Sequence, residues 1–348
     1  MDNKVTINDI ARLTGLSKGT VDRVLHNRGE VSKKSYAKVM KVIEELGYKP
    51  NVLASLLARG KGRMIAVLLP EGEKGSFWEL AQSGIARVGA DVQALGVQSR
   101  LFAYDQYDLE SFRATCREVL DSAPDGVVLA PLFREETAHF IVDLEEKGIP
   151  YAFVDSRLDT EHYLAYFGMP MYQSGYLCAD QLTGGAAIGS VLMVRVRRDK
   201  SGQADPTQNR RAGFIDYMLE HSPECSVSNL FIDPDDAKGT YNALDAYFKA
   251  HPETRHIVMF NSRIHLLVPW LAAHPVKGRR VVGFDNLPEN IAALRRGVVT
   301  SLIGQRPDVQ VTRAIEALAE AIVLGHLPPQ KDAFMHMDIL TRYNVDYY

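Results

Sequence analysis

Cysteine is scarce in this chain of 348 residues, and the three that occur are Cys116, Cys178 and Cys225. They are odd in number, widely spaced and not grouped with histidine, so neither a disulfide framework nor a metal site is expected. Long apolar runs are missing too, and none approaches the ~18 residues that span a bilayer. The first residues, MDNKVTINDIARLTG, are too polar for a signal peptide. We therefore expect a cytoplasmic protein that does not act at a membrane.

Phosphate-binding glycine motifs are also absent. The sequence contains no G-x-G-x-x-G and no G-x-x-x-x-G-K-[ST], so nothing supports a bound nucleotide. With no metal cluster either, we expect no cofactor, no metal, no catalytic residue and no enzymatic activity.

Charge is distributed unevenly, although the formal net charge of the whole chain is only -3. Residues 1–60 hold 11 Lys and Arg against 6 Asp and Glu, whereas the remainder holds 29 against 37. A small basic head on an acidic body suggests that the head binds a polyanion, although chance surface charge is an alternative. A hydrophobic content of 46% over this length predicts more than one domain.

Three short helices are predicted in the head, because Thr6, Ser17 and Ser32 each stand where a side chain caps a helix and are each followed by an apolar stripe. Gly15 supplies the turn between the first two. The third helix should bury five apolar side chains: Tyr36, Val39, Met40, Ile43 and Leu46. Two short helices joined by a tight turn and closed by a third describe a helix-turn-helix, or else a generic three-helix bundle with a solvated polar face.

The order of motifs in this region favours the first alternative. The segments are VTINDIARLTGLSKGTVDRVLHNRGEVSKKS and LGYKPNVLASLLARGKG, and together they resemble the lactose-repressor (LacI/GalR) family of bacterial transcription regulators. The match runs from Thr6 through the recognition helix that begins at Ser17 to the hinge around Pro50 and Asn51. The resemblance implies a DNA-binding regulator, in most members a repressor, that acts as a homodimer.

The resemblance also implies which residues contact operator DNA. Lys18 and Gly19 match the two positions that most often set operator choice, and Arg23 matches a base-contacting position. Leu57 matches the side chain that enters the minor groove, although the neighbouring Leu53 and Leu56 are alternative candidates for this role. The assigned positions are Thr6, Ser17, Lys18, Gly19, Thr20, Asp22, Arg23, Asn27, Asn51, Ala54 and Leu57.

Some of these positions depart from the family pattern, and some could have a purely structural role. Leu57 could be an ordinary buried leucine, and Arg23 could pair with Asp22 or Glu30 on the surface. Asp22 replaces a small hydroxyl residue, and Gly19 offers no side chain for base recognition. A carboxylate repels phosphate but accepts a hydrogen bond from cytosine, so we expect an operator unlike that of the best-known members.

The rest of the chain alternates short apolar runs with helical patterns. MIAVLLP, VQSRLFAY, DGVVLAP and IPYAFVD read as strands of one parallel sheet, with helices between them at about 77–95, 108–122 and 134–147. The pattern restarts at a helix near 172–184 and continues through GSVLMVRV, SNLFID, HIVMFN and RRVVGFD. The fold class predicted is a small all-α helix-turn-helix domain followed by a two-lobed, doubly wound α/β domain.

The resemblance continues here, since the body is similar to the type I periplasmic-binding-protein fold that the family uses as a sensor. We expect a DNA-binding domain over 1–49, a hinge helix and linker over 50–61, and an effector-binding and dimerisation domain over 62–348. The predicted N-lobe spans about 62–163 and 301–327, and the C-lobe about 164–300 and 328–348.

Ligands of open α/β sheets bind at the carboxyl ends of the strands. The residues at these ends that the resemblance assigns to the effector are Phe77, Trp78, Asp155, Arg210, Asn261, Asp285 and Gln305. Carboxylates, amides and aromatic faces suit a polyhydroxylated ligand such as a sugar. Two alternatives are structural: Asp285 could cap a helix, and Trp78 could belong to a lobe core.

Two departures bear on the ligand. Asn261 is followed by Ser262, where the family has an acidic residue, and Pro170 stands where Asp or Asn is frequent. Arg263 and Arg306 follow strand ends, so the effector could be a sugar acid or sugar phosphate held by guanidinium groups, unless both arginines are merely exposed. A solute-binding protein and an enzyme on a doubly wound fold remain alternatives, but neither explains the head.

Overall fold

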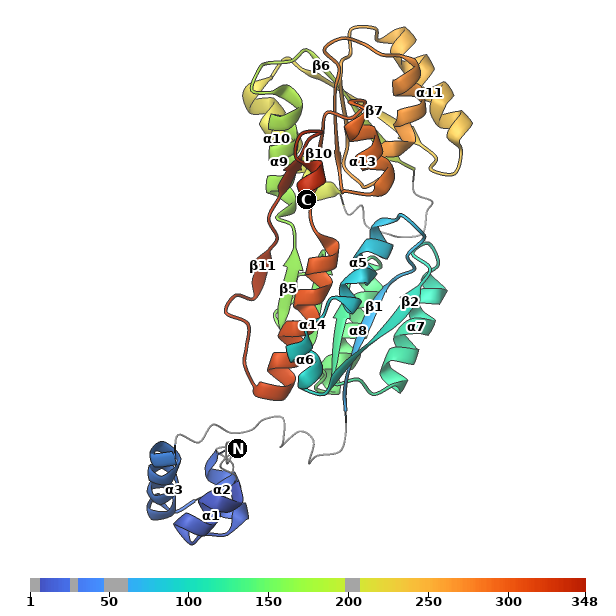
Figure 1. Ribbon diagram of the computed structural model, residues 1–348. Coiled ribbons are helices and arrows are strands. Elements are labelled where there is room, and N and C mark those ends of the chain that lie inside the picture. Colours follow the sequence, from blue (N-terminus) through green and yellow to red (C-terminus); the bar gives the residue numbers. More distant parts are fainter. Residues whose placement is uncertain (1–6, 26–30, 47–61, 198–206) are drawn as a thin grey trace. The chain divides into compact units, whose positions relative to one another are not determined.

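The computed structural model describes residues 7–25, 31–46, 62–197 and 207–348 (Figure 1). Its contacts divide the chain into two units, Met1–Lys61 and Gly62–Tyr348, here called the head and the sensor. Within the described ranges no helix is both long enough and apolar enough to cross a membrane.

Three short helices make up the described part of the head: α1 (Ile7–Thr14), α2 (Lys18–Leu25) and α3 (Lys33–Leu46). Gly15, with a φ of +63°, makes the turn between α1 and α2. The Ser17 hydroxyl accepts a hydrogen bond from the Thr20 amide at 3.2 Å, and the Ser32 hydroxyl accepts one from the Ser35 amide at 3.2 Å. The predicted caps of α2 and α3 are therefore confirmed, whereas Thr6 lies outside the described residues.

The hydrophobic core of the head contains fewer buried side chains than the sequence pattern predicts. It consists of Ile10, Val21, Val24 and Val39, with other apolar residues partly buried around them. Three side chains that we expected to be buried on α3 are 38–45% exposed, which is a correction to the predicted stripe: Tyr36, Met40 and Leu46. A unit of this size buries too little surface to cover a full apolar stripe on every helix.

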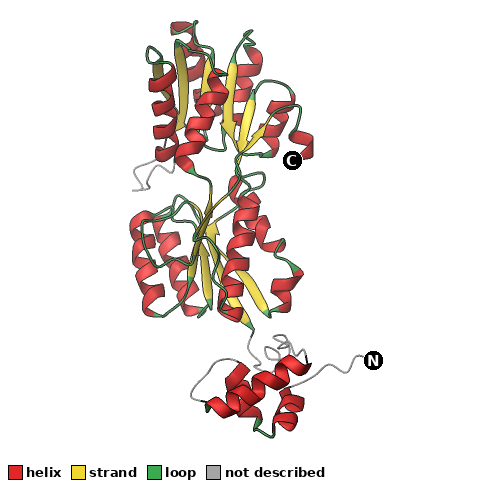
Figure 2. Cartoon of the chain, turned by 90° about the vertical axis from the view of Figure 1, so that its left-hand side faces the viewer, coloured by secondary structure: helices red, strands yellow, loops and turns green. Residues whose placement is uncertain are grey.

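The sensor contains two six-stranded sheets with helices on both faces of each (Figure 2). In the first lobe the strand order is β11-β5-β4-β3-β1-β2. Its elements are β1 (Arg63–Pro70), α5 (Phe77–Ala86), α6 (Ala90–Ala94), β2 (Val97–Tyr104), α7 (Leu109–Asp121), β3 (Gly126–Leu129), α8 (Arg134–Glu146), β4 (Tyr151–Asp155), β5 (Ala165–Gly168), α14 (Pro307–Leu324) and β11 (Asp332–Phe334). The helix predicted over 77–95 is thus interrupted between α5 and α6.

In the second lobe the strand order is β12-β10-β9-β8-β6-β7. Its elements are α9 (Met171–Thr183), β6 (Ser190–Val196), α10 (Gln208–His221), β7 (Ser226–Ile232), α11 (Ala237–Ala250), β8 (His256–Met259), η1 (Ile264–Leu267), α12 (Val268–Ala273), β9 (Arg280–Phe284), α13 (Pro288–Arg295), β10 (Ser301–Gly304), β12 (Asp338–Leu340) and η2 (Val345–Tyr347). The pairings are parallel except that of β10 with β12, which is antiparallel.

The lobe limits predicted from the sequence need a correction. Strand β5 pairs with β4 in the first sheet, although the N-lobe was expected to end at residue 163. Strand β10 pairs with β9 in the second sheet, although we assigned residues from 301 onward to the N-lobe. Strand β11, expected in the C-lobe, pairs with β5. These strands have only three or four residues, and their partners are set by long-range pairing that a local apolar pattern does not encode.

The chain consequently crosses between the lobes three times, after β5, after β10 and after β11. Helix α14 begins directly after the second crossing and packs into the core of the first lobe through Val311, Ile315 and Leu318. The carboxyl ends of the parallel strands of both lobes carry the residues of the candidate ligand site.

Candidate functional site

The N-terminal end of α2 is the predicted DNA-reading surface. Ser17, Lys18, Gly19 and Arg23 are exposed there, and Thr20 is half-buried. The Arg23 Nε donates to the Gly19 carbonyl at 3.2 Å, which holds the guanidinium along the helix. Backbone amides and the helix dipole make such an end attractive to phosphate.

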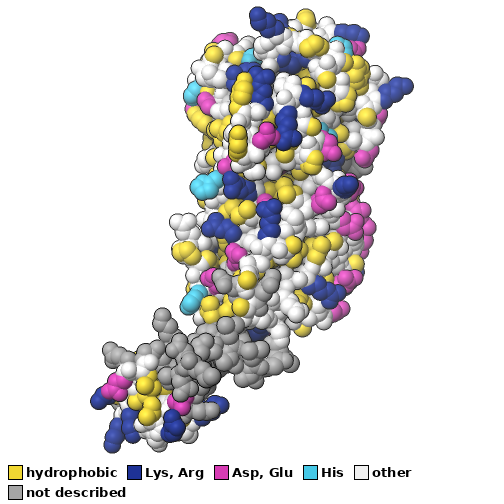
Figure 3. All heavy atoms as spheres, viewed as in Figure 1, with side chains coloured by type: hydrophobic (Ala, Val, Ile, Leu, Met, Phe, Trp, Pro, Cys, Tyr) yellow, Lys and Arg dark blue, Asp and Glu magenta, His cyan; other side chains and the backbone are white. Residues whose placement is uncertain are grey.

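Figure 3 shows basic side chains at several points on the described surface of the head. The Ser17 and Thr20 hydroxyls lie 2.9 Å apart, so Ser17 both caps α2 and contacts Thr20. The side chain of Asp22 is not described. The other predicted DNA contacts lie outside the described residues, namely Thr6, Asn27, Asn51, Ala54 and Leu57.

A buried polar network joins three of the predicted effector residues in the second lobe. Arg210, on the first turn of α10, donates from Nη2 to the Gln305 Oε1 at 3.4 Å. Gln305 follows β10 and donates from Nε2 to the Asp285 Oδ1 at 2.9 Å, so its amide links the guanidinium to the carboxylate. All three side chains are at most 4% exposed.

Arg210 is held from several further directions. Its Nε donates to the Ser174 hydroxyl of α9 at 3.0 Å, and its Nη1 donates to the Phe260 carbonyl at 2.5 Å. The guanidinium carbon lies 3.9 Å from the centre of the Phe284 ring. These contacts fix the orientation of the guanidinium within the network.

Asp285 is the most unusual member of this network. It lies directly after β9 with a φ of +69°, a left-handed conformation that a non-glycine residue rarely adopts and that is common at ligand sites. Burial raises the pKa of its carboxyl to about 7, against the opposing effects of Arg210 and the hydrogen bond from Gln305. It does not cap α13, because the residue at the helix start is Leu287, so the structural alternative is wrong for this aspartate.

Asp155 lies at a similar place in the first lobe, as the last residue of β4, and its φ is +63°. Its amide donates to the Gln310 Oε1 at 2.9 Å, and the Gln310 Nε2 donates to the Gln305 carbonyl at 2.9 Å. One buried glutamine of α14 therefore links a strand end of the first lobe to a strand end of the second. Sequence reasoning missed Gln310, although a polar residue on the apolar face of α14 could have signalled it.

The two aromatic candidates differ in how far they are buried. Phe77 is half-buried against the hydrophobic core of the first lobe, and its ring meets that of Trp78 edge-on with centroids 4.9 Å apart. Trp78 is only 8% exposed and belongs to the hydrophobic core of the first lobe. The structure therefore supports the core alternative for Trp78 and leaves Phe77 as the aromatic candidate.

Two asparagines complete the strand ends of the second lobe. Asn261 is half-buried, and its Oδ1 accepts a hydrogen bond from the Arg263 amide at 3.0 Å. Asn286, which sequence reasoning missed, has a buried Oδ1 for which the described residues offer no hydrogen-bond partner. A buried amide oxygen needs a donor, and a ligand hydroxyl beside Asp285 could supply it.

The two arginines proposed as counter-charges for an acidic ligand differ. The Arg263 Nη2 donates to the Tyr107 hydroxyl at 2.7 Å, and this hydrogen bond links the end of β8 in one lobe to the loop after β2 in the other. The Arg306 Nε pairs with Asp338 at 2.7 Å. Arg306 already has a carboxylate partner, so Arg263 is the better candidate for contact with an anionic ligand.

A helix-turn-helix head and a two-lobed sensor with a buried polar network at its strand ends together define the class of ligand-responsive DNA-binding regulators. The family model for bacterial regulatory proteins of the lacI family matches residues 6–51, and that for the periplasmic binding protein domain matches residues 65–326. The chain belongs to the lacI family of bacterial regulatory proteins.

Curated relatives agree with this assignment. The chain is 30% identical to the HTH-type transcriptional regulator DegA of Bacillus subtilis over 43% of this chain and 44% of that protein. It is 25% identical to the ribose operon repressor of Halalkalibacterium halodurans over 81% of each chain. The alignment thus spans less than half of the first relative and most of the second.

Solved structures extend the comparison to the sensor. A protein from Bacteroides fragilis assigned as a LacI transcriptional regulator superposes with a TM-score of 0.77 at 31% identity, covering 83% of this chain and all of that one. A carbohydrate transporter solute-binding protein from Agrobacterium radiobacter, in complex with D-arabinose, gives a TM-score of 0.67 at 20% identity, over 82% of this chain and 96% of that one. The latter likeness concerns the fold alone.

Proposed function

We propose that this protein is a transcription repressor whose affinity for operator DNA is switched by a small ligand in the sensor. The observation that carries the proposal is the buried network of Arg210, Gln305 and Asp285, which lies at strand ends of a sensor joined to a helix-turn-helix head. A solute-binding protein would have no use for such a head. We also propose that the chain is not an enzyme and that it acts in the cytoplasm, where its DNA is.

We propose that two chains pair through their sensors and set two recognition helices on adjacent half-sites. Lys18, Gly19, Thr20 and Arg23 would face the major groove, with Ser17 near phosphate. The assignments of Thr6, Asp22, Asn27, Asn51, Ala54 and Leu57 rest on the family resemblance. Since a ligand that prefers one arrangement of the lobes changes DNA affinity by the same factor that DNA changes ligand affinity, the two sites are linked.

The ligand class that we propose is a sugar or a sugar derivative. Asp285 and Gln305 offer an acceptor and a donor to neighbouring hydroxyls, Arg210 offers fixed donors, and Phe77 offers a ring face. Asp155 and Asn261 lie at further strand ends and would extend these contacts. Relatives described as the ribose operon repressor and the sucrose operon repressor support this class. Arg263 would add affinity for a sugar acid or sugar phosphate.

Thermal-shift screening of the full chain against sugars, sugar acids and sugar phosphates tests the ligand class. A ligand that binds only the folded protein raises its melting temperature by mass action, and Asp285→Asn should remove that increase. A ligand that stabilises wild type and Asp285→Asn equally would show that it binds elsewhere. No stabilisation by any of the three classes would contradict the proposed chemistry.

A further inference from the structure

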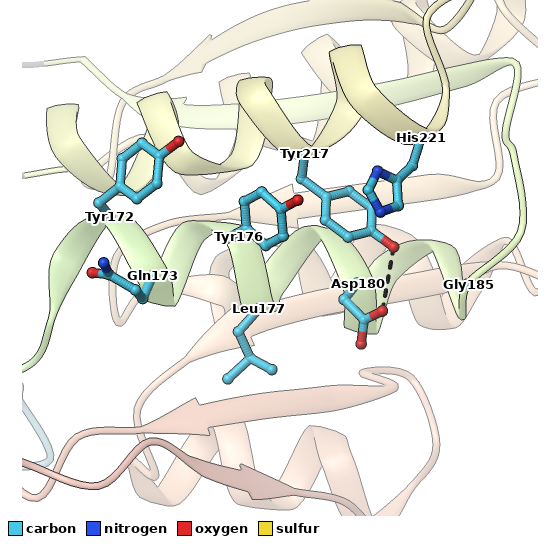
Figure 4. Close-up of a pocket in the computed structure, with 8 residues that line it drawn as sticks. All are labelled: Tyr172, Gln173, Tyr176, Leu177, Asp180, Gly185, Tyr217 and His221. Carbon is cyan, nitrogen blue, oxygen red and sulfur yellow. Dashed lines mark hydrogen bonds between the residues drawn. The ribbon is translucent and has the colours of Figure 1, made fainter.

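A cavity of about 540 Å³ lies between α9 and α10 on the second lobe, apart from the strand ends described above (Figure 4). Helix α9 contributes Tyr172, Tyr176, Leu177 and Asp180 to its lining, and α10 contributes Tyr217 and His221. The volume is within the range of small-molecule sites. The lining contains no lysine and no arginine, although the chain as a whole has 40 of them.

Three of the aromatic side chains that line this cavity contact one another. Tyr176 and Tyr217 are edge-to-face, with centroids 4.9 Å apart and an interplanar angle of 82°. His221 stacks on Tyr217 at 4.2 Å and stands at 87° to Tyr176. These contacts hold the rings in place in the cavity wall, and the face of an aromatic ring attracts a cation such as an ammonium group.

Each tyrosine hydroxyl donates to a carboxylate. Tyr172 donates to the Asp216 Oδ2 at 2.7 Å, Tyr176 donates to Glu220, and Tyr217 donates to the Asp180 Oδ1 at 3.2 Å. The hydrogen bond to Glu220 raises the pKa of Tyr176 to about 12, so its hydroxyl stays protonated at neutral pH. A phenol that donates to an anion has a more electron-rich ring, and the carboxylates add negative potential, so both features favour a cation.

The two helices that carry the cavity pack closely against each other. A Cβ at Gly175 would overlap the carbonyl oxygen of Arg210, and a Cβ at Gly213 would overlap that of Tyr172. Only glycine at these two positions allows the helices to approach so closely, and the approach sets the spacing of the rings. The cavity is therefore a property of the packed helix pair rather than of loose surface side chains.

We propose that the cavity between α9 and α10 is a second ligand site of this protein, selective for a small organic cation with an ammonium group. The tyrosine faces would contact the alkyl groups around the nitrogen, and Asp180 would lie beside the positive charge. Neutral sugars lack the charge that this lining favours, so the site differs in chemistry from the one at the strand ends.

The test is calorimetric titration of the full-length protein with choline chloride, compared with dimethylbutanol, its uncharged isostere, at matched ionic strength. We expect saturable binding of choline and none of dimethylbutanol. Tyr176→Leu and Tyr172→Leu should each weaken choline binding about threefold to fivefold, because each removes a ring face. Tyr176→Phe, which keeps the ring, should bind choline within about twofold of wild type.

Two controls locate the site. Tyr343→Leu removes a tyrosine that is 76% exposed elsewhere on the lobe, and Asp285→Asn alters the proposed sugar site. Both variants should bind choline like wild type. Equal binding of choline and dimethylbutanol, no binding across the millimolar range, or wild-type binding by Tyr176→Leu and Tyr172→Leu would each overturn the proposal.

Discussion

The two lobes of the sensor have equivalent strand orders, yet the aspartates at the ends of two matching strands have different surroundings. Asp155 is the last residue of β4, Asp285 directly follows β9, and both have a positive φ. Asp285 is buried in a network with Arg210 and Gln305, whereas Asp155 is only half-buried. The two aspartates therefore share a backbone conformation but differ in their surroundings. Asp285 belongs to a buried polar network in the second lobe, whereas the carboxylate of Asp155 in the first lobe is more exposed.

This difference suggests that the two lobes have different roles in ligand binding. The second lobe would hold the ligand through preset donors and acceptors, and the first would close over it. Two contacts already span the lobes: Gln310 joins Asp155 to Gln305 near a crossing, and Arg263 meets Tyr107 at a different pair of strand ends. The following predictions test this asymmetry, from the largest expected effect to the smallest.

Arg210→Met should have the largest effect, because it removes the charge that partly compensates buried Asp285 and leaves the Ser174 hydroxyl and Phe260 carbonyl without their donor. We expect the free energy of unfolding to fall by about 3 kcal/mol, measured by urea denaturation followed by circular dichroism. Asp155→Asn in the first lobe is the matched control and should cost less than about 1 kcal/mol. Equal losses of unfolding free energy in the two variants would contradict the proposed difference between the lobes.

Gln310→Met should cost about 2 kcal/mol, because it removes the hydrogen bonds from the Asp155 amide and to the buried Gln305 carbonyl while nearly conserving volume. The same urea titration measures this loss. Thr312→Val, two residues along α14, also removes a polar group and serves as the control, since its hydroxyl only bonds helix carbonyls. If Gln310→Met were as stable as Thr312→Val, the link that Gln310 makes between the lobes would not contribute to the stability of the protein.

Asp285→Asn should change how stability depends on pH. Burial raises the pKa of Asp285 to about 7, above its ordinary value of 3.8, so folding favours the protonated carboxyl. Its contribution is fully present below about pH 4 and is lost as the pH rises to about 7, at no more than about 1.4 kcal/mol per pH unit. Melting curves between these values should show a flatter pH profile for Asp285→Asn than for wild type. Superimposable profiles would mean that Asp285 does not titrate in this range.

Arg263→Gln should have the smallest effect on stability, less than about 0.5 kcal/mol, because its contact with Tyr107 is exposed. Its effect on ligand choice should be larger if the effector is acidic. In that case the variant weakens binding of the acidic ligand and not of its neutral parent sugar, as measured by calorimetry. Arg306→Gln, whose arginine is already paired with Asp338, should leave both affinities unchanged. If Arg306→Gln weakened binding of the acidic ligand and Arg263→Gln did not, Arg306 and not Arg263 would be the counter-charge.

Much of this comparison was accessible from the sequence, because it rests on local signals. Apolar runs located the central strands, and the family resemblance assigned the residues at their ends to the effector, among them Asp155, Asp285 and Gln305. The cap residues Ser17 and Ser32 marked the helix starts in the head. Each of these predictions depends on residues close together in the chain.

The parts that the sequence did not reveal depend on long-range packing. Strands β5, β10 and β11 are too short for a local pattern to say which sheet they join. Trp78 was expected at the ligand and lies in a core, because helix position alone does not say which way a ring faces. The polar Gln310 on the apolar face of α14 was a local signal, but its partners, like the surroundings of Asn286, follow from atoms that the fold brings together from distant parts of the chain.

The most direct test of the account is the effect of a sensor ligand on DNA affinity. The full chain is first used to select its operator from a random duplex library, and the ligand found by thermal shift is then added in a fluorescence anisotropy titration. We predict that the ligand changes the operator affinity of wild type, that Asp285→Asn binds the operator normally without responding to the ligand, and that Arg23→Ala loses sequence preference. An operator affinity that is the same with and without bound ligand, or an equal response in wild type and Asp285→Asn, would contradict the account.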